Sequence, residues 1–176
     1  QLSEVEMLAT SITLLSGGHE TTTGLIGNGL LALLQHPTQL RRLQDDPALI
    51  PHAIEELLRY DSPVQRAERL TRESVEIDGR TISAGERVLL VVAAANRDPA
   101  QFPEPDRLDV GRQENRHVAF GLGTHFCIGA PLARMEGRLA IETILRRFPS
   151  LGLEEHELAW QENVALRVLK RLSVRF

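Results

Sequence analysis

The sequence predicts a mainly α-helical protein with small antiparallel β-sheets. Residues 3–36 and 128–148 carry apolar side chains at helical spacing, whereas residues 67–92 alternate between apolar and polar side chains, as strands do. The 176 residues are enough for one domain with a sizeable core. Hydrophobic residues make up 42% of the chain and charged residues 25%, which is typical of soluble globular proteins.

A single long helix is predicted over residues 3–36. Ser3 and Glu6 form a capping-box pattern at its start. The predicted helix is about three times as long as an average helix of roughly 11–12 residues. The glycine pair at residues 17–18 weakens such a helix by roughly 1 kcal/mol per glycine relative to alanine. We interpret this pair as a place where another body approaches the helix closely.

Shorter elements follow. Pro37 stops the first helix and begins a short one that runs to Gln44, and a further helix is predicted over residues 51–60. The alternating pattern of residues 67–92, with an Asp-Gly turn at residues 78–79, predicts a small antiparallel sheet.

The last third of the chain combines a loop, a helix and a β tail. Residues 99–129 are rich in proline and glycine and are predicted to form a long ordered loop, and loops of this length are usually functional. A helix is predicted over residues 128–148, and Pro149 ends it. Residues 151–176 are predicted to form short strands.

Charge and cysteine content narrow the function. The net charge of −4 argues against a nucleic-acid partner, because phosphate binding requires a basic surface. The single cysteine forms no intrachain disulfide and fits a reducing cytoplasm. The apolar stretch at residues 88–95 is too short to cross a bilayer, so no membrane partner is expected. The chain opens on a helix at Gln1 without a signal peptide, and we expect an N-terminal part to be missing.

Cys127 is the first candidate for chemistry. It lies where a glycine-rich loop meets the start of a predicted helix, and a helix N-terminus favours the thiolate form of cysteine. Glycines in the loop allow the backbone to approach a flat body closely. By these residues alone, three alternatives stay open: a buried structural cysteine, a catalytic nucleophile and a zinc ligand, although zinc requires further ligands at short spacing.

The stretch Phe120-Gly-x-Gly-x-His-x-Cys-x-Gly129 resembles the haem-ligand signature of the cytochrome P450 family, soluble bacterial type. The resemblance implies that the Cys127 thiolate is the metal ligand to the iron of haem b, and that its electron donation favours O–O cleavage. It also implies that His125 binds a haem propionate. The remaining predicted cofactor-binding residues of this loop are Phe120, Gly121, Gly123 and Gly129.

Residues 17–22, Gly-Gly-His-Glu-Thr-Thr, resemble the distal-helix signature of the same family, in which alanine is commoner than glycine at position 17. The resemblance implies that the glycines widen the helix locally. It also implies that Thr21 hydrogen-bonds dioxygen or a neighbouring water, and that Glu20 relays protons from solvent, so that both are catalytic. Without the resemblance, Glu20 and Thr21 fit an ordinary solvated helix face equally well.

The sequence Glu56-Leu-Leu-Arg59 places an acid and a base three residues apart on a predicted helix. Such a pair is normally a surface ion pair worth roughly 0.2–0.5 kcal/mol. The P450 resemblance implies a buried pair joined by a second arginine from the loop before the cysteine, and Arg107 fits that position. Glu56, Arg59 and Arg107 are therefore predicted to form a structural triad.

The resemblance also implies a second propionate ligand and a substrate pocket. Arg69 is the predicted propionate ligand, with Arg66 as its rival and an exposed strand arginine as the plain alternative. For the pocket residues, a simple core role is at least as plausible. The predicted pocket residues are Leu14, Gly17, Gly18, Val64, Gln65 and Val168.

Taken together, residues 1–176 resemble the C-terminal, haem-binding half of a soluble bacterial P450. This implies monooxygenation of a small organic substrate by O2, with electrons from a ferredoxin or similar redox partner. The basic residues Arg112, Arg116 and Arg134 are expected to dock such an acidic partner. Two other hypotheses stay open: a truncated haem-binding or interaction fragment without oxygenase activity, and a haem-free helical scaffold.

Overall fold

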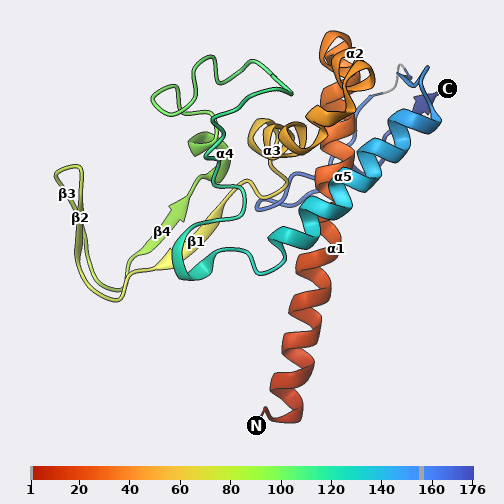
Figure 1. The fold of residues 1–176 in the computed structure, drawn as a ribbon. Coiled ribbons are helices and arrows are strands. Elements are labelled where there is room, and N and C mark those ends of the chain that lie inside the picture. Colours follow the sequence, from red (N-terminus) through yellow and green to blue (C-terminus); the bar gives the residue numbers. More distant parts are fainter. Residues whose placement is uncertain (1, 155–156) are drawn as a thin grey trace.

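The computed structural model describes residues 2–154 and 157–176, and it confirms a mainly helical fold with small antiparallel sheets (Figure 1). The α-helices are α1 (Glu4–Gln35), α2 (Pro37–Asp45), α3 (Ile50–Tyr60), α4 (Val92–Ala95) and α5 (Ala130–Arg147). Two short 3-10 helices are η1 (Pro47–Leu49) and η2 (Gly123–His125). In the described residues, no helix combines the length and apolar character that a membrane crossing requires.

Within residues 2–154 and 157–176, the strands form three separate antiparallel pairs. They are β1 (Ala67–Leu70) with β4 (Arg87–Leu90), β2 (Val75–Ile77) with β3 (Arg80–Ile82), and β5 (Gly152–Leu153) with β6 (Val174–Arg175). The predicted sheet over residues 67–92 is therefore two pairs rather than one sheet, and its last strand ends at Leu90 because α4 begins at Val92. The β2–β3 hairpin extends away from the helices (Figure 1).

Local signals account for the ends of α1. The Ser3 hydroxyl accepts the Glu6 N–H, and the Glu6 carboxylate accepts the Ser3 N–H at 2.8 Å, which completes the capping box. The other end is at Gln35, where His36 forms the C-cap before Pro37 begins α2. The first half of α1 protrudes from the rest of the chain, and residues 2–19 are exposed (Figure 1).

The core lies where the second half of α1 meets α3 and α5. Leu33, Leu57 and Ile141 from these three helices are almost fully buried. Glycines allow the close approach: a Cβ at Gly137 of α5 would lie 3.0 Å from Leu25 of α1. This packing fixes the positions of α3 and the start of α5, and both carry candidate site residues.

Gly24 of α1 offers a test of this packing. A Cβ at Gly24 would lie 2.9 Å from the Pro63 Cβ and 3.1 Å from the Val168 Cγ2, whereas a Cβ at Gly27 would meet nothing within 4 Å. Gly24→Ala is expected to lower the free energy of unfolding by about 1–3 kcal/mol through overpacking. Gly27→Ala is expected to raise it by up to about 1 kcal/mol through helix propensity. Urea unfolding of both variants measures the difference, and equal midpoints would contradict the packing.

Candidate functional site

Cys127 lies between η2 and α5 in a tightly turned loop. Its N–H donates to the Phe120 carbonyl at 2.9 Å, and its own carbonyl accepts the Ala130 N–H at 3.3 Å. Gly121 and Gly123 have φ angles of +73° and +65°, which side-chain-bearing residues rarely adopt. Cys127 is exposed, so it is not the buried structural cysteine that the sequence left open.

The surroundings of Cys127 are apolar and uncovered. Three apolar side chains of the same loop, Leu122, Phe126 and Ile128, are 72%, 49% and 89% exposed. Exposure of these apolar side chains to water is unfavourable in free energy unless another molecule or another part of the protein covers them. The loop therefore presents a thiol together with apolar side chains that a flat apolar group would bury. His125, predicted to bind a propionate, is exposed within η2.

Thr21 lies on the face of α1 that is directed towards α5, because it is one turn before Leu25, which packs against Gly137. Its hydroxyl donates to the Gly17 carbonyl at 2.5 Å. Helix α1 stays α-helical through Gly17 and Gly18, so the predicted local widening does not appear as a break. Glu20 is half-buried.

The predicted pocket residues fall into two groups. Val64 pairs with Leu166 in a β-bridge, and the Gln65 N–H donates to the Ala165 carbonyl at 2.8 Å, so the segment after Pro63 packs on the tail that carries buried Val168. The other three residues lie on the protruding half of α1, where a Cβ at either glycine would meet nothing within 4 Å. That second group is Leu14, Gly17 and Gly18.

The Arg69 side chain is exposed on β1, and its guanidinium donates to the neighbouring Glu68 carbonyl at 2.8 Å. Its rival, Arg66, is half-buried just before β1. The choice between the two arginines as propionate ligands stays a prediction.

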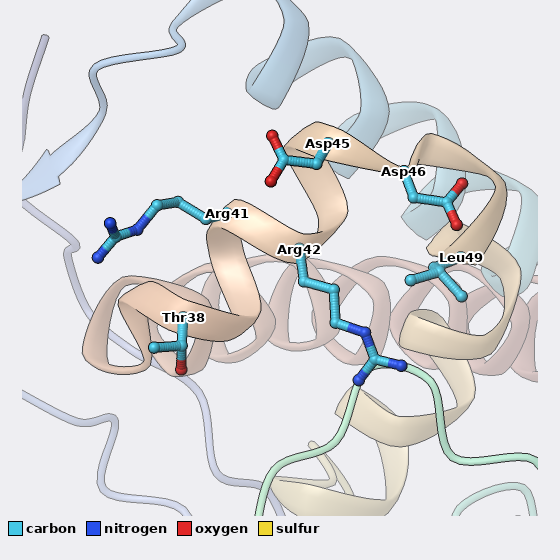
Figure 2. Close-up of a pocket in the computed structure, with 6 residues that line it drawn as sticks. All are labelled: Thr38, Arg41, Arg42, Asp45, Asp46 and Leu49. Atoms are coloured by element: carbon cyan, nitrogen blue, oxygen red, sulfur yellow. The ribbon is translucent and has the colours of Figure 1, made fainter.

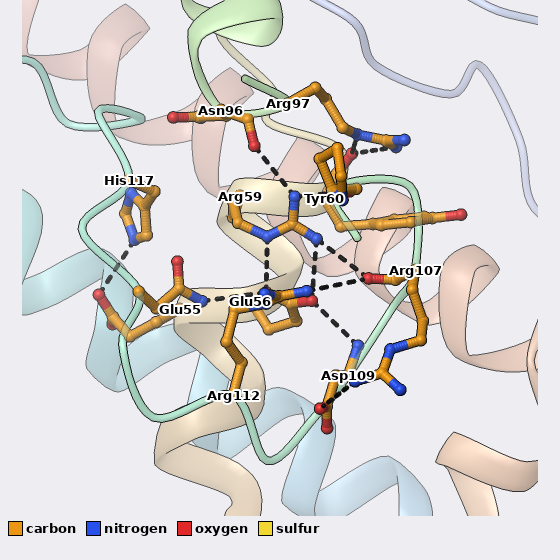
Figure 3. Close-up of polar contacts among 12 residues, drawn as sticks. Glu55, Glu56, Arg59, Tyr60, Asn96, Arg97, Arg107, Asp109, Arg112 and His117 are labelled. Carbon is orange, nitrogen blue, oxygen red and sulfur yellow. Dashed lines mark hydrogen bonds and ion pairs between the residues drawn. The ribbon is translucent and has the colours of Figure 1, made fainter. Parts of the chain in front are cut away.

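Glu56 and Arg59 form a fully buried ion pair on α3, with 0% and 1% of their surface exposed. The Arg59 Nε and Nη2 donate to the two Glu56 carboxylate oxygens at 2.7 and 2.9 Å. Arg59 also donates to three backbone carbonyls, those of Asn96, Pro105 and Arg107, at 3.0, 2.8 and 3.2 Å (Figure 3). The guanidinium therefore joins α3 to the end of α4 and to the long loop.

The Glu56 carboxylate accepts three further hydrogen bonds from that loop. They come from the Asp109 N–H at 2.9 Å, the Arg112 Nε at 3.1 Å and the Asn115 Nδ2 at 3.0 Å. Buried charges are tolerated when paired and hydrogen-bonded in this way. The network ties residues 96–115 to α3 and so determines where the following Cys127 loop begins.

The prediction that the Arg107 side chain is the third member of the triad is wrong. The Arg107 carbonyl faces Arg59, and this orientation directs the side chain to solvent, where it is 57% exposed and pairs with Glu104 and Asp109. The second guanidinium that pairs with Glu56, besides that of Arg59, belongs instead to Arg112, whose side chain is 10% exposed. The same contact leaves little of Arg112 exposed, whereas the predicted docking surface for a redox partner requires an accessible cation.

Replacing these two arginines separately is expected to have unequal effects. Arg112→Ala removes a charged donor from buried Glu56 and is expected to cost about 1.5–3 kcal/mol of unfolding free energy. Arg107→Ala removes exposed ion pairs worth about 0–1 kcal/mol and keeps the carbonyl that Arg59 uses. Denaturant unfolding compares the two variants, and a larger loss for Arg107→Ala would restore the sequence prediction.

Glu55, the residue beside Glu56, forms a second cluster that the sequence did not reveal. Its carboxylate receives Arg134 Nε and Nη2 at 2.7 and 2.8 Å, and His117 Nε2 lies 3.1 Å from it (Figure 3 shows the histidine contact). His117 is 3% exposed, and its Nδ1 accepts the Ala119 N–H, so Nε2 carries the proton. These residues are 62 and 79 positions from Glu55, so no local pattern joins them.

The Glu55 cluster is expected to make stability sensitive to acid. Burial raises the pKa of the Glu55 carboxyl, but hydrogen bonds from Arg134 and His117, together with the charge of Arg134, outweigh it and lower the pKa from 4.5 to about 2. Because the folded pKa is depressed, the stabilisation is present above the unfolded pKa and is lost as pH falls towards about 2. The stability difference between the wild type and Glu55→Gln, roughly 3 kcal/mol at most, should shrink over that range. Urea unfolding between about pH 2 and pH 6 measures it, and a constant difference would contradict the pairing.

A surface depression of about 520 Å³ lies on α2 and η1 (Figure 2). One of its lining residues, Arg42, pairs through its guanidinium with Asp109 at 2.8 Å. These elements carry none of the predicted site residues. The lining residues are Thr38, Arg41, Arg42, Asp45, Asp46 and Leu49.

The sequence of this chain matches the model of a known protein family. Residues 46–162, more than half of the chain, match the family model described as Cytochrome P450. The chain belongs to the cytochrome P450 family. The matched residues include the buried Glu56–Arg59 pair and the Cys127 loop.

Curated P450 relatives from bacteria match the chain over nearly its full length. The vitamin D(3) 25-hydroxylase of Pseudonocardia autotrophica is 51% identical over 177 residues, which cover 99% of this chain and 44% of the relative. The biotin biosynthesis cytochrome P450 of Bacillus subtilis is 47% identical over 176 residues, covering 100% of this chain and 45% of the relative. The chain thus spans less than half the length of these relatives.

Solved P450 structures share the fold. A crystal structure of P450BioI in complex with hexadec-9Z-enoic acid ligated acyl carrier protein has a TM-score of 0.97 and 47% sequence identity. The match covers 100% of this chain and 46% of that one. A haem-thiolate cofactor is characteristic of the P450 family, and the loop described above fits such a group: an exposed thiol at a helix start, surrounded by uncovered apolar side chains.

Proposed function

We propose that this chain is the C-terminal, haem-binding half of a longer haem-thiolate monooxygenase. The intact protein would oxidise a small organic substrate with O2 and with electrons from a ferredoxin or similar partner. The observation that carries the proposal is the exposed Cys127 thiol in the turn before α5, inside a P450 ligand motif. A cysteine that is exposed in this way is accessible to the iron.

Haem b would be held by the Cys127 thiolate as the proposed iron ligand, while Phe120, Gly121, Gly123 and Gly129 would shape the loop around that sulfur. His125 and Arg69, both exposed, are the proposed propionate ligands. When bound, the haem supplies the activation of dioxygen.

Thr21 and Glu20 are the proposed proton-handling residues. The Thr21 hydroxyl proton is already donated to the Gly17 carbonyl, so the hydroxyl oxygen is left to accept a hydrogen bond from a proton-bearing group such as water. Glu20 is the preceding residue and is half-buried, which suits a carboxylate that passes protons between solvent and that position.

The substrate is proposed to lie between α1 and the junction of Val64, Gln65 and Val168. The relatives are named for a vitamin D(3) hydroxylation and for biotin biosynthesis, and one structural neighbour holds a fatty acid on a carrier protein. These names share the class of small organic molecules rather than a single compound, so we propose that class for this chain.

Two uncovered apolar faces support an origin in a longer protein. Val5, Leu8, Ile12 and Leu15 follow one another on α1 at helical spacing and are 54–76% exposed. A second set lies at and just before α5: Ile128, Leu132, Met135 and Leu139, each 51–89% exposed. Soluble monomers seldom expose apolar stripes of this size. We propose that the remaining half of the protein covers both.

A redox partner is proposed to dock near the Cys127 loop. Of the three arginines considered, Arg116 is exposed, whereas Arg112 is engaged with Glu56 and Arg134 with Glu55. Charge reversal at Arg116 should slow electron transfer from an acidic ferredoxin, and an unchanged rate would remove this residue from the docking surface.

The haem proposal is tested by adding haem to the chain, reducing it under carbon monoxide and recording the Soret band. The strongly red-shifted band typical of thiolate-ligated haem supports it. A band typical of other axial ligands indicates haem binding without the thiolate, which is the alternative of a haem-binding fragment without oxygenase function. The absence of any Soret band indicates the haem-free scaffold. Product formation by the longer protein with a redox partner then tests the oxygenase activity.

A further inference from the structure

Arg134, a member of the Glu55 cluster, also contacts the loop that carries Cys127. On one side its guanidinium binds both Glu55 oxygens at 2.7 and 2.8 Å. On the other side its Cζ lies 4.6 Å from the centre of the Phe120 ring, a cation–π distance. The carbonyl of this same Phe120 accepts the Cys127 N–H at 2.9 Å. A single cation thus links α3 to the residue that holds the cysteine backbone.

His117 makes the link rigid. It donates from Nε2 to Glu55 and accepts the Ala119 N–H on Nδ1, and its ring lies 6.0 Å from that of Phe120. The beginning of the cysteine loop and the start of α5 are therefore both tied to the Glu55 carboxylate. Neither Glu55 nor His117 belongs to the Glu56–Arg59 network, although Glu55 and Glu56 are adjacent.

The arrangement has an electrostatic consequence at the sulfur. The pKa of Arg134 is raised, mainly by its hydrogen bond to Glu55 and also by the charge of Cys127. The guanidinium thus binds a carboxylate directly and stands over the ring of the residue whose carbonyl holds the Cys127 N–H, so its charge lies near the cysteine loop. Because Glu55 is bound to Arg134, the negative charge of Glu55 reduces the positive electrostatic potential that Arg134 produces at the Cys127 sulfur.

We propose that Glu55 is a positioning residue that holds Arg134 over Phe120 and sets the electrostatic potential at the Cys127 sulfur. This inference deepens the proposed function, because a potential at the axial ligand alters the reduction of the haem iron. Loss of the carboxylate leaves an uncompensated cation at the Phe120 ring, and loss of the guanidinium leaves an uncompensated anion at Glu55. The two changes therefore act in opposite directions.

The first experiment needs no haem. Cys127 is the single cysteine and is exposed, so its alkylation rates with anionic iodoacetate and neutral iodoacetamide report the potential at its sulfur. Glu55→Gln is expected to raise the iodoacetate-to-iodoacetamide rate ratio about twofold, and Arg134→Gln to lower it about twofold. The double variant Glu55→Gln/Arg134→Gln should return close to the wild-type ratio.

Two matched controls separate charge from structure. Arg134→Lys keeps the charge and loses the bidentate geometry, so its ratio should stay near that of the wild type. Glu76→Gln removes a carboxylate on the distant β2–β3 hairpin and should change nothing (Figure 1). A loosened loop would accelerate both reagents alike and leave the ratio unchanged. The same ratio in Glu55→Gln and Arg134→Gln would overturn the proposal.

The haem-loaded protein gives a second measurement. Reduction adds an electron at the iron, so an uncompensated cation favours the reduced state. Glu55→Gln is expected to raise the ferric–ferrous reduction potential and Arg134→Gln to lower it, whereas shifts of the same sign in both variants would overturn the proposal. If the chain binds no haem, the proposed function is refuted, but the further inference is not. The alkylation ratios then still decide whether Glu55 and Arg134 set the electrostatic potential at Cys127.

Discussion

Replacement of Arg59 with leucine is expected to lower the free energy of unfolding by about 3–5 kcal/mol, the range for breaking a buried ion pair. The change leaves the Glu56 carboxylate without its bidentate partner at 0% exposure. It also removes the donor for three backbone carbonyls at 2.8–3.2 Å. Urea unfolding followed by circular dichroism measures the loss.

A double variant sharpens this expectation. Replacing a buried ion pair by apolar residues is often close to neutral. Here Glu56→Met/Arg59→Met is expected to stay strongly destabilised, because the carbonyls that Arg59 satisfies would remain buried without a donor. The exposed pair Arg87–Glu68 provides the surface control, and Arg87→Ala should leave the unfolding midpoint nearly unchanged. An Arg59→Leu loss as small as that of the control would show that the network contributes little.

Cys127→Ala is expected to abolish the thiolate-type carbon monoxide spectrum completely. In P450s the sulfur electron pair reaches the iron from a cysteine thiolate, and an alanine methyl group offers no ligand. The fold itself should be retained, because Cys127 is exposed and an exposed substitution changes stability by about 0.5 kcal/mol or less. The Soret band of the reduced, carbon monoxide-treated protein provides the measurement.

Two observations make the Cys127 result interpretable. The unfolding curve of Cys127→Ala without haem must match that of the wild type, which excludes a folding defect. Cys127→His, which offers a nitrogen ligand at the same place, is expected to bind haem with a band typical of imidazole ligation. Survival of the thiolate-type band in Cys127→Ala would refute the assignment of the axial ligand.

The element pattern followed from short-range signals. The capping box at Ser3, the stop before Pro37 and the Asp78-Gly79 hairpin each depend on residues within a few positions of one another, and the structure contains all three. The one-sheet interpretation of residues 67–92 was wrong, because β1 pairs with β4 and leaves β2 and β3 to pair with each other. Alternation predicts strands, but it does not say which strands are partners.

By itself, the sequence determined the four longer helices, the hairpin, the position of the cysteine before a helix and the family, whereas it gave no sign of the short helix α4. These depend on spacing along the chain, which fixes which residues share a face or a turn. Only the tertiary structure decided that Arg112 rather than Arg107 reaches Glu56, and that His117 and Arg134 meet at Glu55. The arginines look alike in the sequence. Which of them is buried depends on how the loop of residues 96–115 folds over α3, since only the guanidinium that turns inwards finds a buried carboxylate.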